Sequence, residues 1–320
     1  MSILVLIDQA EGQIKKSSFE AACYGSQLAA KMGVPAEALV IGTVKDNLQL
    51  LGNFGISKVH HYQSDDGALH DASSAATLIA SAVSAANASV IIFSNNSFSK
   101  NVAPRLSVKL KAGLVTGAVA LPDLSQGFVV KKSVFSGKAF AHVAIHTDKK
   151  IICLNPNSIK TEAGSALAEV AAFSSTVAAP VIEKIRTEKV SGEISLTEAD
   201  IVVSGGRGLK GPENWGMVTD LAGLLGAATA CSRPVADIHW RPHHEHVGQT
   251  GIAIAPNLYI AIGISGAIQH LAGVNRSKTI VVINKDPEAP FFKAADYGIV
   301  GDAFEVMPKI IEAVRKLKTA

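Results

Sequence analysis

The stretch Leu258-Tyr-Ile-Ala-Ile-Gly-Ile-Ser-Gly-Ala-Ile-Gln-His270 decides the fold of the second half of the chain. Its apolar start, Tyr259 to Ile264, is typical of a buried parallel strand, and Ala267 to Leu271 predicts the first turn of a helix. Backbone N–H groups at such a turn, together with the positive end of the helix dipole, suit a phosphate. His270 lies about one turn into the helix and can face the same ligand. On this stretch alone, a plain strand–turn–helix connection remains the alternative.

The composition leaves room for two α/β domains. The chain has 320 residues, of which 48% are hydrophobic and 18% charged, and a net charge of +3. This small charge, without a long Lys/Arg run, argues against nucleic acid as a partner. The three cysteines have no CxxC spacing and predict neither a disulfide framework nor a zinc site. The apolar run at residues 1–8 is too short for a membrane span or a signal peptide, so we expect a cytoplasmic protein without direct membrane insertion.

The first half of the chain alternates predicted strands with predicted helices, one of which is Pro104–Leu110. This alternation, with short links, predicts a parallel sheet that is covered on both faces. From residue 128 onward, three strand-like runs follow one another without helices, and they predict an antiparallel extension of the sheet. These runs are Val129–Val134, Ala141–His146 and Ile151–Leu154. Ala178–Ile185 is a candidate for the last strand of this domain.

We place the domain boundary near Lys189, so that an N-terminal α/β domain covers residues 1–188 and a doubly wound α/β domain covers residues 189–320. Polar residues collect at five predicted strand ends of the second domain: Arg207, Arg233, Ser265 with its glycines, Asn284 and Asp302. In a parallel sheet these ends lie along one edge, where ligands bind. Pro234 predicts an extended backbone for Arg233, which suits contact with a planar or anionic ligand. Solvated surface charges remain the alternative for both arginines.

The second half of the chain resembles the alpha-subunit family of electron transfer flavoproteins. The matching segments run in order from about Ile201 to Ile310: Val203-Ser-Gly-Gly-Arg-Gly-Leu209, Ser232-Arg-Pro234, Val247-Gly-Gln-Thr-Gly251, Leu258 through Gly273, Ile283-Asn-Lys-Asp-Pro-Glu-Ala-Pro290 and Ala295-Asp-Tyr-Gly-Ile299. The first half resembles the family's N-terminal domain more weakly, at Ala103-Pro-Arg-Leu106 and Phe135-Ser-Gly-Lys-Ala139.

The resemblance implies FAD, held mostly by the second domain. It assigns the pyrophosphate and its surroundings to Arg207, Gly263, Ser265, Gly266, Ala267, Ile268 and Gln269. It assigns the adenosine end to Asn284 and Asp302. The residues that it places around the isoalloxazine ring are Ser232, Arg233, Gln249, Thr250 and His270, with Val247 and Gly248 in the same loop.

The resemblance also implies an electron carrier and not an enzyme. Single electrons would pass from flavin dehydrogenases, of the acyl-CoA dehydrogenase type in fatty acid β-oxidation, to a membrane quinone oxidoreductase. The carrier state would be an anionic semiquinone that Arg233 and His270 stabilise. A beta subunit would complete a heterodimer, and the first domain would supply the interface. The residues around the ring include no nucleophile–base pair and no paired carboxylates.

The chain departs from the family pattern at two positions. His246 stands where the family commonly has Gln, and Val282 where it usually has Ala. Our hypothesis is that His246 lies near the flavin and makes its redox potential depend on pH. Three alternatives stay open at this point: an adenine-nucleotide-binding sensor without a redox role, a flavoenzyme with a bound substrate, and a bifurcating or nitrogen-fixation variant of the same family.

Overall fold

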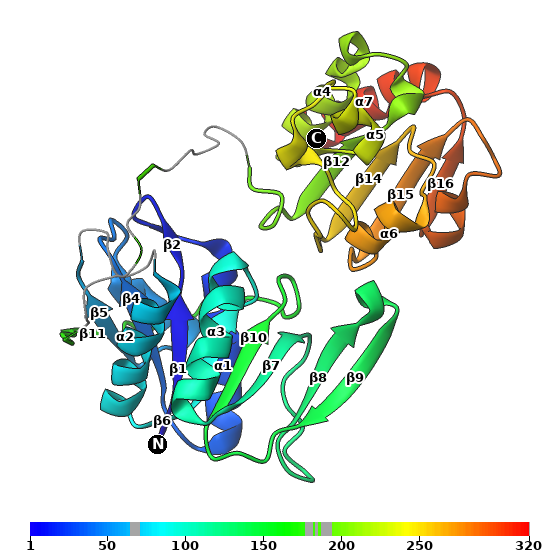
Figure 1. Cartoon of the computed structure of the whole chain (residues 1–320). Coiled ribbons are helices and arrows are strands. Elements are labelled where there is room, and N and C mark those ends of the chain that lie inside the picture. The colour runs from blue at the N-terminus through cyan, green and yellow to red at the C-terminus, as the bar shows by residue number, and fades with distance from the viewer. Residues whose placement is uncertain (65–70, 177–181, 183–184, 187–193, 320) are drawn as a thin grey trace. The chain divides into compact units, whose positions relative to one another are not determined.

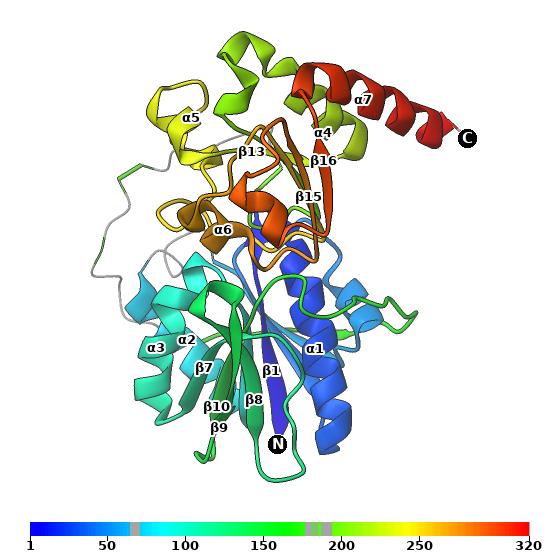
Figure 2. The same ribbon diagram turned by 90° about the vertical axis from the view of Figure 1, so that its right-hand side faces the viewer.

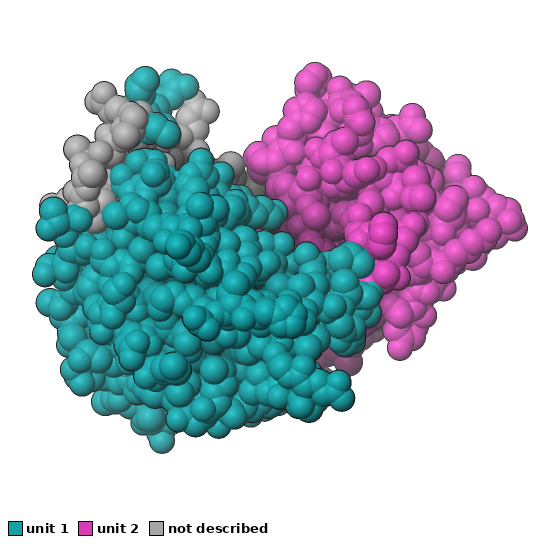
Figure 3. All heavy atoms as spheres, turned by 60° about the horizontal axis from the view of Figure 1, so that its bottom comes forward, with its two compact units in different colours: residues 1–134, 140–188 teal, residues 135–139, 189–320 magenta. Residues whose placement is uncertain are grey.

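The computed structural model describes residues 1–64, 71–176, 182, 185–186 and 194–319. The chain forms two compact units, which are coloured separately in Figure 3. Unit 1 consists of residues 1–134 and 140–188, and unit 2 consists of residues 135–139 and 189–320. Most of the candidate strand Ala178–Ile185 lies outside the described residues.

Unit 1 is built on a nine-stranded sheet in the order β11-β5-β4-β1-β6-β10-β7-β8-β9 (Figure 1). Its strands are β1 (Ser2–Ile7), β4 (Ala36–Ile41), β5 (Lys58–Tyr62), β6 (Ala88–Ser94), β7 (Gly113–Ala118), β8 (Val129–Val134), β9 (Ala139–Ala144), β10 (Lys150–Leu154) and β11 (Glu169–Ala172). A small hairpin, β2 (Gln9–Ala10) with β3 (Gln13–Ile14), follows β1. The seven strands from β11 to β7 pair in parallel, and β8 pairs antiparallel with β7.

Helices cover both faces of this sheet because alternate residues of its strands point to opposite sides. Ile3 and Val5 of β1 pack with helix α1 (Lys16–Met32) and the 3-10 turn η1 (Leu48–Phe54). Leu4 of β1 packs on the other face with α2 (Ala72–Ala85) and α3 (Ser97–Leu110). Figure 2 shows β1 between α1 on one side and α2 and α3 on the other.

Two expectations for unit 1 are corrected by the structure. Ile151–Leu154 does not belong to the antiparallel extension, because β10 lies in parallel between β6 and β7. Its continuously buried side chains are typical of a central strand, whereas β9 has the alternating exposure of a half-buried one. Helix α3 begins at Ser97, well before Pro104, because Asn96 and Ser99 form a capping box at its start.

Unit 2 is built on a five-stranded parallel sheet in the order β13-β12-β14-β15-β16. The strands are β12 (Ile201–Gly205), β13 (Ala228–Cys231), β14 (Leu258–Ile262), β15 (Thr279–Asn284) and β16 (Tyr297–Val300). In chain order this is a doubly wound 2-1-3-4-5 arrangement, in which the connections reverse direction between β12 and β14. A ligand crevice is expected at the carboxyl ends of these two strands.

The faces of the second sheet are covered by helices and 3-10 turns. Helices α4 (Gly216–Leu225), α5 (Arg233–Asp237) and α7 (Ala303–Thr319) pack on one face, and α6 (Ile268–Val274) and η6 (Pro290–Ala294) on the other. Three further 3-10 turns are η3 (Arg207–Leu209), η4 (Pro212–Asn214) and η5 (His243–Glu245). Both units thus confirm the predicted α/β class. Within the described ranges, no helix combines the length and the apolarity that crossing a bilayer requires.

A buried carboxylate orders the loop that follows β10 in unit 1. Glu20 of α1 accepts hydrogen bonds from the backbone N–H groups of Asn157 (2.8 Å), Ser158 (2.6 Å) and Ile159 (2.9 Å). Three donors that converge on one anion would all lose their partner if the carboxylate were removed.

We therefore expect Glu20→Ala to lower the free energy of unfolding by about 2–3 kcal/mol, since buried donors would be left unsatisfied. Urea denaturation followed by circular dichroism measures this change. Glu312→Ala is the control, because Glu312 forms an exposed pair with Lys316, which is worth about 0.5 kcal/mol or less. Equal stability of the two variants would contradict the role assigned to Glu20.

Candidate functional site

Two glycine turns pass each other where the doubly wound sheet reverses its connections. The N–H of Gly206, after β12, donates to the carbonyl of Ile262 (2.9 Å), and the N–H of Gly208 donates to the carbonyl of Gly263 (3.0 Å). A Cβ atom on Gly206 would lie 2.2 Å from the carbonyl oxygen of Gly263, and one on Gly208 would lie 2.6 Å from its Cα. Gly263 itself has φ +62°, which favours glycine. This close approach leaves no space for side chains at the crossing.

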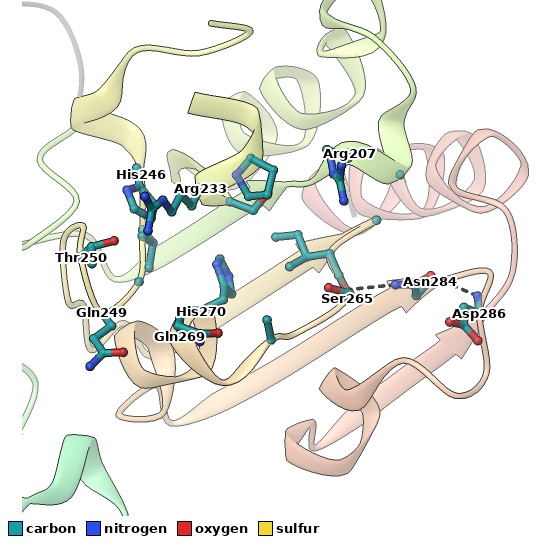
Figure 4. Close-up of a pocket in the computed structure, with 18 residues that line it drawn as sticks. Arg207, Arg233, His246, Gln249, Thr250, Ser265, Gln269, His270, Asn284 and Asp286 are labelled. Atoms are coloured by element: carbon teal, nitrogen blue, oxygen red, sulfur yellow. Dashed lines mark hydrogen bonds between the residues drawn. The ribbon is translucent and has the colours of Figure 1, made fainter. Parts of the chain in front are cut away.

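A pocket of about 520 Å³ opens at this crossing, along the carboxyl ends of the strands. Its volume lies in the range of small-molecule and cofactor sites. The lining residues are Arg207, Gly208, Ser232, Arg233, Pro234, His246, Val247, Gly248, Gln249, Thr250, Gly263, Ile264, Ser265, Ala267, Gln269, His270, Asn284 and Asp286 (Figure 4). The strand-end loops of one parallel sheet therefore converge, as the sequence pattern predicts.

Three residues expected at the site do not line this pocket: Gly266, Ile268 and Asp302. Gly266 has φ +79°, and its turn packs against Phe291. Ile268 begins α6 with a side chain that is 62% exposed. Asp302 accepts a hydrogen bond from the N–H of Phe304 (3.0 Å) at the start of α7 and forms an ion pair with Lys210 (3.6 Å).

Four lining residues are absent from the set expected from the sequence: Gly208, Pro234, Ile264 and Asp286. All of them lie within or beside strand-end loops that the sequence analysis singled out, so proximity in the chain was the available signal. Asp286 follows Asn284 by two residues, and its N–H donates to the Asn284 side-chain oxygen (3.1 Å). The Asn284 amide in turn donates to the carbonyl of Ile264 (3.0 Å), which ties β15 to the turn after β14.

Arg233 and Ser265 differ from their expected local geometry. Arg233 is not extended but begins the short helix α5, and the extended residue is Ser232. Pro234 is tolerated there because the first turn of a helix does not use its backbone N–H groups. The Arg233 side chain is 62% exposed and forms an ion pair with Asp237 (3.3 Å). Ser265 does not cap α6, whose first residue is Ile268, and it lines the pocket instead.

His270 is one of the buried polar residues of the pocket wall. Its Nε2 atom lies 2.8 Å from the hydroxyl oxygen of Tyr259, and its Nδ1 atom is enclosed by the protein. Burial, reinforced by the neighbouring His246, lowers the pKa of His270 to about 4. The imidazole is therefore neutral near pH 7. Burial also lowers the pKa of His246, and the Asp237 carboxylate opposes this shift.

The residues of the pocket fit a flavin dinucleotide on their own chemistry. Arg207 and Arg233 supply permanent positive charge for an anionic pyrophosphate or an electron-rich ring. The glycine crossing lets the backbone come close to a ligand without a side chain between. His270 adds a buried imidazole to the wall. Gln249 and Thr250 add neutral donors and acceptors to the wall.

Comparisons with known proteins agree with this chemistry. Residues 195–275 match the family described as the electron transfer flavoprotein FAD-binding domain, and residues 3–180 match the electron transfer flavoprotein domain. Electron transfer flavoprotein subunit alpha of Bacillus subtilis is 36% identical over 320 residues, with 98% of each chain covered. The subunits alpha of Syntrophomonas wolfei (35% over 322 residues, 98% of each chain) and Mycobacterium tuberculosis H37Rv (36% over 323 residues, 99% of each) are similar. The cofactor of the second unit is FAD.

We expect Gly206→Ala to reduce the amount of bound FAD and to lower the free energy of unfolding by about 1–3 kcal/mol, because its Cβ would overlap the carbonyl of Gly263. The ratio of visible to ultraviolet absorbance of the purified protein measures FAD occupancy. Gly223→Ala is the control, since a Cβ there meets no atom within 4 Å and α4 gains helix propensity. Full occupancy in Gly206→Ala would contradict the tight crossing.

Proposed function

Because the chain belongs to the alpha-subunit family of electron transfer flavoproteins, we propose that it is a carrier that relays single electrons through FAD. The donors are flavin dehydrogenases, of the acyl-CoA dehydrogenase type, and the acceptor is a quinone oxidoreductase. The bound FAD supplies the one-electron redox chemistry. The observation that carries the proposal is that Arg233 and the buried, neutral His270 line the same pocket.

The charge of the pocket supports a carrier that stabilises added electrons. A flavin that accepts one electron without a proton becomes negative, and Arg233 keeps its positive charge at any physiological pH. A preorganised cation and hydrogen-bond donors in a partly closed site favour the reduced, negative state over the oxidised one. Arg207 lies at the turn after β12, where it serves the pyrophosphate, and Gln249 and Thr250 serve the ring.

The lining also argues for a carrier and against an enzyme with its own substrate. Asp286 is its one carboxylate, so the lining offers no pair of carboxylates for acid–base work.

We also propose a heterodimer with a beta subunit, whose interface unit 1 supplies. The relatives named above are alpha subunits. The match to this chain covers 98% of each of them and 98% of this chain. Unit 1 exposes apolar side chains at Val108 (80%), Leu167 (63%) and Phe140 (57%). Apolar groups on the surface are candidates for burial by a partner chain.

Anaerobic, stepwise reduction of the complex, co-expressed with its beta subunit, tests the proposed function. We expect a yellow protein that passes through the red anionic semiquinone at half reduction, because a fixed cation at the ring stabilises one added negative charge. Arg233→Gln should decrease the amount of this species, and Arg233→Lys, which keeps the charge, should retain most of it. Direct two-electron reduction of the wild-type complex would favour a flavoenzyme or a bifurcating variant, and a protein that cannot bind FAD would favour a nucleotide sensor.

We expect the first reduction potential to fall by up to about 59 mV per pH unit over a window set by His246. A negative ring raises the pKa of His246 from its lowered value, so reduction takes up protons between the two pKa values and becomes harder as the pH rises. His246→Gln should flatten this slope. His146→Gln is the matched control, since His146 belongs to unit 1 and does not line the pocket. An identical slope in His246→Gln would contradict this assignment.

A further inference from the structure

The antiparallel end of the sheet in unit 1 has one bare face. Val130 of β8 and Val143 of β9 pack against the core that β1 shares with α1. Because side chains alternate along a strand, Lys131, Phe140 and His142 face the opposite side, where α3 lies. The described core on that side ends at β7. Figure 1 shows β8 and β9 extending past α3 without a helix over them.

This face does not have the composition of a sheet face that stays in water, which is typically polar. The ring of Phe140 is 57% exposed, although the ammonium group of Lys131 lies 4.3 Å from its centroid. At the rim, α3 packs on β7 and β10 and carries Val108, which is 80% exposed, close in sequence to the exposed cations Arg105 and Lys109. The basic face consists of these five residues and His142. Apolar groups that are rimmed by charges are typical of a site for a partner protein.

The basic face lies in a region whose charges are nearly all positive. Residues 72–134 and 140–147 of unit 1 contain six Lys or Arg residues and one acidic residue, Asp123. The whole chain has 30 Lys and Arg against 27 Asp and Glu, so the remainder of the chain has more acidic than basic residues. In the described part of the chain, none of these six cations forms an ion pair. The basic face therefore attracts a surface of opposite charge.

A lipid surface also attracts cations, but the basic face does not have the form that a bilayer selects. A helix that lies in a membrane interface buries an apolar stripe among the lipids. The apolar stripe of α3, with Val102, Ala103 and Leu106, is already buried in the core of unit 1. A pleated face with an aromatic ring is instead matched by the side chains of another folded surface, as in sheets that pack face to face. The occupant is therefore a protein.

We propose that the basic face docks the beta subunit, and that the beta subunit meets it with an acidic surface around an apolar centre. The inference rests on the proposed heterodimer, to which it adds a place and a charge. A partner that covers Phe140 and Val108 also removes water from Arg105, Lys109 and Lys131, and a cation without water needs a carboxylate nearby. Two copies of this chain would bring cations against cations, so the same charges favour the heterodimer over a homodimer.

Charge reversal in the complex with the beta subunit tests the inference. Lys109→Glu and Lys131→Glu should each raise the dissociation constant of the heterodimer about tenfold or more at low salt, because a like charge then faces the carboxylates of the partner. Raising the ionic strength to about 1 M, where the screening length is about 3 Å, should remove most of this difference. Fluorescence-detected sedimentation over a dilution series of the co-purified complex measures the constant.

Two further variants separate charge from packing. Lys160→Glu is the matched control, because it makes the same change in net charge and Lys160 lies outside the basic face, beside Glu162 (3.4 Å). It should leave the dissociation constant almost unchanged. Phe140→Ser should weaken the heterodimer at every ionic strength, because it removes apolar contact area and no charge. FAD content and thermal unfolding establish that each variant is folded.

The possible results are decisive for the basic face. Equal dissociation constants for the reversed variants and the Lys160→Glu control would overturn the inference. An unaffected heterodimer, with a loss of binding to phosphatidylglycerol vesicles in Lys109→Glu and Lys131→Glu, would overturn it in favour of a lipid surface. Both results leave the proposed heterodimer standing, since the wild-type chains still associate. A wild-type chain that forms no complex with the beta subunit would instead reject the proposed heterodimer.

Discussion

The site depends on one steric constraint, the crossing of the turns after β12 and β14. Gly206 and Gly208 meet Gly263 at distances that exclude any Cβ atom, and two backbone hydrogen bonds hold the crossing together. Because β12 and β14 are neighbours at the point where the sheet reverses its connections, this contact sets how far apart their loops begin. Arg207, in the loop after β12, and His270, in the helix after β14, both take their positions from this crossing. A small change at the crossing would therefore alter both ends of the pocket.

Much of this arrangement follows from the local sequence. Alternating strands and helices predict parallel sheets, and polar residues at strand ends predict a shared edge, which is how Arg207, Ser265 and Asn284 come to line one pocket. His270 is predicted for a similar reason, since it lies in the first turn of the helix that follows β14. The sequence pattern does not predict which residue contacts the imidazole of His270. Tyr259 has the pattern of an ordinary core residue in a buried strand, and only the fold brings its hydroxyl oxygen within 2.8 Å of Nε2 of His270.

The errors have physical causes of the same kind. The run Ile151–Leu154 has the composition of any buried strand. Its place between β6 and β7 depends on pairing with strands that are distant in the sequence. Arg233 shows that a residue before proline can still begin a helix when the chain turns there. The prediction for Asp302 at the adenosine end stays open: it follows a strand, as a ligand-facing residue would, and it also precedes α7, where its carboxylate caps the helix. A carboxylate between a strand end and a helix start can face a ligand or cap the helix.

The two units differ in where their anions come from. In unit 1, the carboxylate that gathers the N–H groups of residues 157–159 belongs to Glu20 of the chain itself. A tethered anion is present at a high effective concentration and cannot be lost by dilution. In unit 2, the corresponding negative charge arrives with a separate molecule, so its occupancy follows the supply of FAD. The first unit thus completes its loop during folding, and the second couples its stability to the availability of cofactor.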